Sequence, residues 1–126
     1  MIKYIELKTG HSDNGPAWIA RVLVSRSGQT LYFGDKALRK GGGQLISGNY
    51  LDVSNGDEYW VSGVKKRGGD RLGTGSGNIG IEGSAVPEYL EEVGIMVLPR
   101  GIVAVEDLAT PDPSRFAGIE NATIPR

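Results

Sequence analysis

Apolar and polar residues alternate in short segments along the first two-thirds of the chain, and glycine, asparagine or proline separates these segments. Alternation with a period of two is typical of β-strands that have one buried face. We predict strands over residues 3–8, 17–25, 30–33, 36–40, 49–53, 58–66 and 78–82. The pair Asn55-Gly56 favours a tight hairpin, because both residues tolerate positive φ. Short antiparallel strands joined by tight turns predict a mainly-β fold, either a small antiparallel barrel or a strongly bent sheet.

The segment 17–25 is apolar on both of its expected faces. One face carries Trp18, Ala20, Val22 and Val24, and the other carries Ile19, Arg21 and Leu23. We therefore expect this strand to be covered on both sides, with Trp18 as an anchor of the core.

One segment has helical spacing instead, and it predicts a short helix near residues 85–93, over Val86 to Val93. Ser84 is the expected N-cap, Pro87 lies in the first turn, and Gly94 supplies the stop. We expect this helix to cap one open end of the barrel.

The length of 126 residues fits one domain. Within it, we expect a β-rich body with its capping helix over residues 1–94 and a C-terminal extension over residues 95–126. Leu98-Pro-Arg-Gly101 is expected to turn a small hairpin, followed by a proline-spaced, irregular tail. The extension is expected to dock on the same domain.

The chain has no cysteine and one histidine, His11. The composition therefore excludes disulfides, thiolate metal sites, cysteine nucleophiles and multi-histidine metal sites. The longest apolar runs are far too short to span a bilayer, and the first residues do not resemble a signal peptide. These features favour a cytoplasmic protein that does not contact membranes.

The formal net charge is −1, but the charges are unevenly distributed. Residues 1–81 carry eleven Lys or Arg against seven Asp or Glu, and residues 82–126 carry three against eight. The first part is therefore basic, at +4, and the second is acidic, at −5. Two interpretations stay open: two ordinary mixed surfaces, or a basic body whose acidic C-terminal part folds back on it or stays apart.

Motifs of catalysis or cofactor binding are weak in this chain. Gly75-Ser-Gly-Asn-Ile-Gly80 matches a dinucleotide-binding pattern by letter, but that site needs a strand before it and a helix at it. Here the residues from Ile79 onward continue as a strand. Ser12 and Asp13 lie beside His11, but adjacency in the sequence does not imply the geometry of a catalytic triad. We therefore predict no catalytic residue, no cofactor and no metal site.

The sequence marks one candidate interaction surface, where a strand with two adjacent aromatic residues leads into a basic, glycine-rich loop. We assign to this surface Tyr59, Lys65, Lys66, Arg67 and Arg71. Cations beside aromatic rings suit single-stranded nucleic acid, because the cations follow phosphates and the rings stack on bases. The alternation also allows Trp60 to be a core residue, and the acidic balance of the whole chain disfavours a dedicated nucleic-acid binder.

Four stretches carry a family resemblance: residues 4–19, Tyr32-Phe33 with Lys36-Ala-Leu38, residues 58–66, and Asp70-Arg71. Over roughly residues 4–92 the chain resembles a family of small bacterial proteins, some of which bear the label deoxyxylulose-phosphate synthase. That label does not fit this chain. A thiamine-diphosphate enzyme needs a large cofactor cleft and a Gly-Asp-Gly metal-binding motif, and the sequence contains no Gly-Asp-Gly.

We therefore expect a non-enzymatic module that binds another macromolecule, with a protein partner or a second copy of the chain favoured. A small barrel that binds single-stranded nucleic acid is the alternative, and an enzyme of unnamed reaction is the third possibility.

Overall fold

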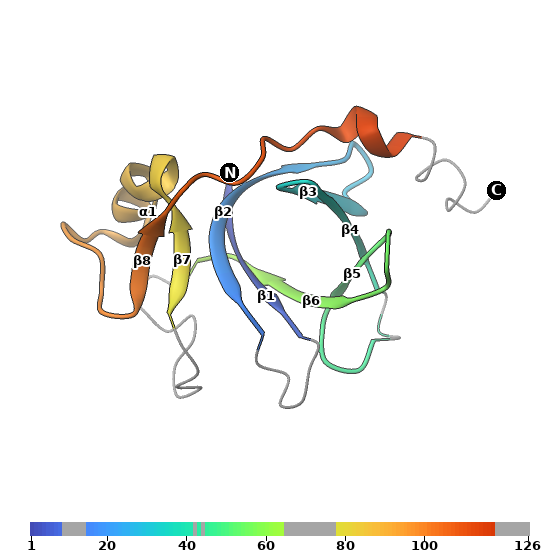
Figure 1. The fold of residues 1–126 in the computed structure, drawn as a ribbon, viewed down its shortest axis with the longest axis horizontal. Helices are drawn as coiled ribbons and strands as arrows, with labels where there is room; N and C mark the ends of the chain where they lie inside the picture. The colour runs from blue at the N-terminus through green and yellow to red at the C-terminus, as the bar shows by residue number, and fades with distance from the viewer. Residues whose placement is uncertain (9–14, 42, 44, 65–77, 118–126) are drawn as a thin grey trace.

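Six antiparallel strands close into a barrel in the computed structural model, which describes residues 1–8, 15–41, 43, 45–64 and 78–117 (Figure 1). The barrel strands are β1 (Ile2–Leu7), β2 (Ala17–Val24), β3 (Thr30–Phe33), β4 (Lys36–Lys40), β5 (Tyr50–Asp52) and β6 (Glu58–Ser62). Their order is β1-β6-β5-β4-β3-β2, and pairing of β1 with β2 closes the barrel. The predicted mainly-β class and the small antiparallel barrel are confirmed.

Tight turns connect neighbouring strands of the barrel. Gly34 turns β3 into β4 with φ of 56°, and Gly56 follows Asn55 between β5 and β6 with φ of 79°. Residues with a Cβ rarely adopt such backbone angles, so these two glycines are matched to their turns. The hairpin predicted from Asn55-Gly56 is present.

Two further strands extend the sheet beyond the closed barrel. They are β7 (Ile79–Glu82) and β8 (Ile102–Val105), joined through the 3-10 turn η1 (Gly83–Ala85) and the helix α1 (Val86–Val93). Strand β7 lies parallel beside β2, and β8 lies parallel beside β7. The hairpin expected at Leu98-Pro-Arg-Gly101 is therefore wrong: α1 carries the chain back across the sheet, so β8 starts from the same end as β7.

Apolar residues on the two faces of the strands form two large cores, and a smaller cluster surrounds Phe116. The core inside the barrel contains Ile5, Ala20, Val22, Leu31, Phe33, Leu38, Tyr59 and Val61. The core outside it contains Ile2, Tyr4, Ala17, Ile19, Val64, Ile79, Ile81, Ala85, Tyr89 and Ile102. Strand β2 contributes to both cores, as its two apolar faces predict.

The helix covers the outer core and does not cap an end of the barrel as expected (Figure 1). Val86, Leu90 and Val93 of α1 pack against the outer core, because the outward faces of β1 and β2 are apolar there and need cover. Its bounds match the prediction, and Gly94 ends it with φ of 83°. Ser84 is not the N-cap. It lies inside η1, where its hydroxyl accepts a hydrogen bond from the Arg21 guanidinium.

A buried carboxylate occupies the point where β2 changes partners. One edge of β2 pairs with β7 over residues 17–19 and with β3 over residues 22–24. Between these stretches, the backbone N–H of Arg21 donates to Glu82 Oε1 at 2.8 Å. Glu82 Oε2 accepts from the N–H of Leu108 at 2.8 Å. The Glu82 side chain therefore completes the strand edge and fixes the returning C-terminal segment.

The described part of the C-terminal extension contacts the body at several places. Asp107 accepts a hydrogen bond from the Ser84 N–H at 2.9 Å, and Leu108 packs against the barrel core. Phe116, at the end of the 3-10 turn η2 (Pro113–Phe116), packs with Tyr32 and Ala37 on the outside of β3 and β4. The acidic segment around Glu106 and Asp107 thus folds back on the body.

A second carboxylate fixes the loop before β5. Glu58 accepts hydrogen bonds from the N–H groups of Gly48, Ser47 and Ile46 at 2.9, 2.8 and 3.1 Å, and these bonds lower the pKa of its carboxyl. Gly48 is required there, since a Cβ would lie 2.5 Å from the Tyr59 carbonyl oxygen. Three hydrogen bonds thus tie residues 46–48 to β6, while the Ile46 side chain is 94% exposed.

We expect Glu82→Ala to lower the free energy of unfolding by about 2 kcal/mol or more, because two N–H groups lose their acceptor. Chemical denaturation followed by circular dichroism measures this. Glu92→Ala, which removes an exposed carboxylate from α1, serves as the control and is expected to change stability little. Equal stabilities of the two variants would contradict the role of Glu82.

We expect the stabilising effect of Glu58 to depend on pH. Because its pKa is lower in the folded than in the unfolded chain, its contribution is complete above the unfolded pKa and is lost as the pH falls through the folded value. Glu58→Gln should therefore unfold at a lower denaturant concentration than the wild type at pH ~7, with the difference shrinking below about pH 4. A difference that stays constant across this range would rule the mechanism out.

Candidate functional site

The structure describes one of the five residues that the sequence analysis assigned to an interaction surface. Lys65, Lys66, Arg67 and Arg71 lie outside the described residues. Tyr59 belongs to the barrel core and is 3% exposed, so its assignment to an interaction surface is wrong. Side chains alternate along β6. Because Tyr59 and Val61 point into the barrel, Trp60 between them points outward.

The Tyr59 hydroxyl is not a candidate acid or base at neutral pH. Burial, then the nearby carboxylates of Asp52, Asp57 and Asp35, raise the pKa of Tyr59 to about 12. The phenol therefore stays protonated, and Tyr59 acts as a packing residue.

Trp60 takes the outward position on β6 and is 42% exposed. Glu6 of β1 lies directly opposite it, and Glu58 precedes it by two residues on the same face. Glu6 in turn accepts a hydrogen bond from the Tyr4 hydroxyl and pairs with Lys8 at 3.0 Å. Because Lys8 offsets the charge of Glu6, Glu58 is the carboxylate that disfavours phosphate binding beside the ring.

The structure adds a site that the sequence did not single out, at strand β8. Within the described part of the chain, β8 ends the sheet, and no strand pairs with its second edge. We call this second edge, over Ile102–Val105, the outer edge of β8. Figure 1 shows β8 at the border of the molecule, away from the barrel. Val103 and Val105 are 45% and 39% exposed, and Ala104 is exposed as well.

The ladder with β7 fixes which backbone groups point to the outer edge. Ile79 N–H donates to the Gly101 carbonyl at 2.7 Å, so Gly101 faces β7. Because neighbouring residues of a strand alternate, Val103 and Val105 also direct their backbone groups to β7. Ile102 and Ala104 then direct theirs to the outer edge, where the Ile102 N–H donates to the Pro99 carbonyl at 3.2 Å.

Natural proteins commonly protect sheet edges with lysine, proline or bulges, and Ile102-Val-Ala-Val105 contains neither lysine nor proline. Opposite charges flank the strand: exposed Arg100 precedes it, and exposed Glu106 follows it. The connection from α1 to β8, which lies beside β8 in Figure 1, contains the exposed residues Met96 and Val97. An edge of this kind favours pairing with another polypeptide.

The sequence shows the apolar run at 102–105, but the pattern predicts it as one arm of the hairpin at Leu98-Pro-Arg-Gly101. The lack of charge within the run was the available signal. Its place at a sheet edge depends on the crossover through α1, which the local pattern does not encode.

Other kinds of site find no support in the described residues. In that part of the chain, no group of three or more His, Cys, Asp or Glu side chains is placed to hold a metal ion. No helix there is long and apolar enough to cross a membrane.

Comparison with known proteins gives no relative for this chain. No protein-family model, no curated protein sequence and no solved structure matches it. The resemblance to a family of small bacterial proteins therefore stays a prediction, and the function is argued from the fold and its surfaces alone.

Proposed function

We propose that this protein is a self-associating interaction module of the bacterial cytoplasm, in which two copies pair through the outer edges of their β8 strands. The observation that supports it is the uncharged outer edge with its exposed valines, Val103 and Val105. Pairing two such edges satisfies backbone N–H and C=O groups and removes apolar side chains from water.

The sequence around β8 is complementary to itself in the antiparallel direction. When Val103 lies opposite the Val103 of a second copy, the Ala104 N–H of each copy meets the Ile102 carbonyl of the other. The Ile102 N–H is not used in this pairing, because it donates to the Pro99 carbonyl of its own chain. The same register puts Arg100 opposite Glu106 at both ends of the pair. A two-fold axis through the centre then relates the two copies, as in most protein dimers.

Charge supports a protein partner over a nucleic acid at this surface. Glu106 and Asp107 follow β8 directly, and carboxylates at the end of an edge repel phosphates. They suit a partner that brings Arg100 with it, which a second copy does.

The pairing segment is only four residues long, so we expect a small interface and a reversible dimer.

We expect Ala104→Pro to abolish the dimer. Proline removes an N–H that points to the outer edge, so pairing with a second copy is lost while pairing with β7 is kept. Sedimentation across micromolar to millimolar protein concentrations measures the change. Ala104→Ser keeps the N–H and serves as the control. Val103→Lys, a charge on the edge strand, provides a second route to the monomer if the proline variant does not fold.

We expect reversal of one of the two charges that flank β8, Arg100 or Glu106, to weaken the dimer. Reversal of both charges should restore it. Arg100→Glu or Glu106→Arg places like charges opposite each other twice in the symmetric pair, which should weaken dimerisation by about tenfold. The double variant recreates both opposite-charge pairs. A double variant as weak as the single ones would contradict the antiparallel register.

A protein that stays monomeric at every concentration would overturn the proposal. If labelled single-stranded oligonucleotides then bound with steep salt dependence, the basic segment at Lys65, Lys66, Arg67 and Arg71 would carry the function instead.

A further inference from the structure

A pocket of about 430 Å³ opens at the end of the barrel where β3 begins and β4 ends. Its walls come from the neighbouring strands β4, β5 and β6 and from the residues beside them. The lining consists of Gln29, Lys40, Gly43, Gly48, Asn49, Tyr50 and Val61. A cavity of this volume is large enough for a small organic molecule.

Strand pairing places a cation and a phenol side by side in this pocket. Lys40 lies on the face of β4 that it shares with Leu38, a residue of the core inside the barrel. Tyr50 of β5 is directly opposite Lys40 and packs against the same core. Burial raises the pKa of Tyr50, so its hydroxyl stays protonated at neutral pH and can donate a hydrogen bond. Gln29 lies next to Lys40 on the other side, where its carbonyl accepts from the Lys40 N–H at 2.9 Å.

Another wall of the pocket is fixed by a side chain that takes the place of a strand neighbour. Asn49 Nδ2 donates to the Val61 carbonyl at 2.8 Å, and Asn49 Oδ1 accepts from the Val61 N–H at 2.7 Å. Both polar atoms of the Asn49 amide are thus bound to the backbone of β6. This wall is therefore set before a ligand arrives, which lowers the cost of binding.

The lining carries one charge, and that charge is positive. It contains no Asp or Glu, and in the described part of the chain no carboxylate pairs with the Lys40 ammonium. Glu58 binds the N–H of Gly48 from the outward face of β6, and the N–H groups of Ser47 and Ile46 share its charge. The pocket therefore favours an anion.

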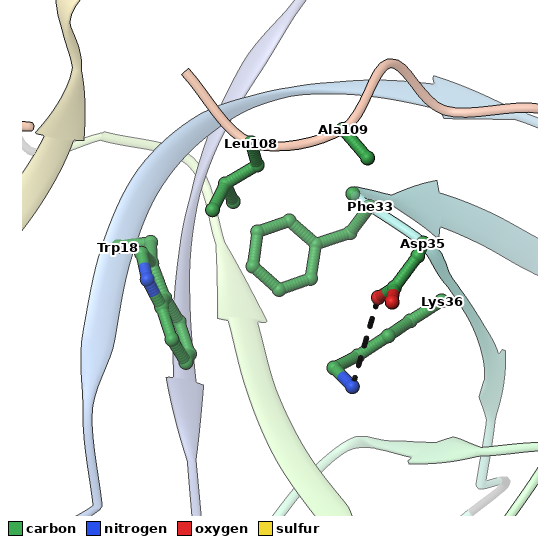
Figure 2. A pocket seen from close by; sticks show the side chains of 7 residues that line it. Trp18, Phe33, Asp35, Lys36, Leu108 and Ala109 are labelled. Carbon is green, nitrogen blue, oxygen red and sulfur yellow. Dashed lines mark ion pairs between the residues drawn. The ribbon is translucent and has the colours of Figure 1, made fainter. Parts of the chain in front are cut away.

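The pocket at the opposite end of the barrel differs in this respect. It lies between Trp18 and Leu108, and the Lys36 ammonium that lines it pairs with Asp35 at 3.9 Å (Figure 2). The charges of that lining are balanced, whereas those at the Lys40 end are not.

We propose that the pocket at Lys40 binds a small organic carboxylate with a flat, apolar body. The Lys40 ammonium offsets the single negative charge, and the Tyr50 hydroxyl and the Gln29 amide donate hydrogen bonds to the carboxylate. The Tyr50 ring and the Val61 side chain contact the apolar body. A phosphate group fits less well, since it carries about two negative charges and the lining offers one cation and no helix N-terminus.

Indole-3-acetate and indole-3-acetamide test this proposal, because the two molecules differ in charge and hardly in shape. In a titration of the isotope-labelled chain followed by NMR, the acetate should saturably shift the side-chain amide of Asn49 and the backbone N–H of Val61. We expect the acetamide to bind at least about tenfold more weakly at constant ionic strength and pH ~7. No saturable shift with the acetate, or equal affinities for the two molecules, would overturn the proposal.

Variants at two cations locate the charge that matters. Lys40→Met keeps the length of the side chain without its charge, and it should weaken binding of the acetate by about tenfold while leaving that of the acetamide unchanged. Arg26→Gln removes an exposed cation from the turn between β2 and β3, outside the lining, and should change neither affinity. Equal losses in the two variants would indicate a diffuse attraction of anions to this end of the barrel and would refute the site.

Discussion

The carboxylate of Glu82 lies where the edge of strand β2 stops pairing with β7 and begins to pair with β3. The barrel, the β7–β8 strands and the C-terminal segment meet at this junction. A strand edge pairs with one neighbour at a time, so the passage from β7 to β3 leaves the Arg21 N–H without a strand opposite it. This N–H is partly buried, and leaving such a group without an acceptor is costly, so the hydrogen bond that Glu82 accepts from it stabilises the junction. Its second oxygen binds Leu108. One residue thereby joins the barrel, the β7–β8 extension and the C-terminal segment.

The sequence predicted the fold class well because its local signals agree. Period-two alternation located the barrel strands, Asn55-Gly56 marked a hairpin, and helical spacing with Gly94 bounded α1. The errors concern relations between distant segments. Whether Ile102–Val105 turns back on its predecessor or runs parallel to β7 depends on what α1 packs against. That packing depends on the outward faces of β1 and β2, far earlier in the chain.

The candidate sites were harder to predict than the fold. Tyr59 and Trp60 are adjacent aromatic residues, and alternation alone does not decide which of them faces the barrel interior. Burial of Val61 with Tyr59 decides it. The pocket at Lys40 has no sequence signature, since its lining residues come from separate strands and only the closed barrel brings them together.

The docking of the C-terminal segment has a consequence for how the chain acquires its structure during synthesis. All six barrel strands have been made once Ser62 has left the ribosome, yet Glu82, Leu108 and Phe116 are still to come. Until they emerge, the edge of β2 lacks its carboxylate, and the barrel lacks the leucine that packs against its core. The nascent barrel is thus an incomplete intermediate, and its final packing follows translation of the segment that crosses it.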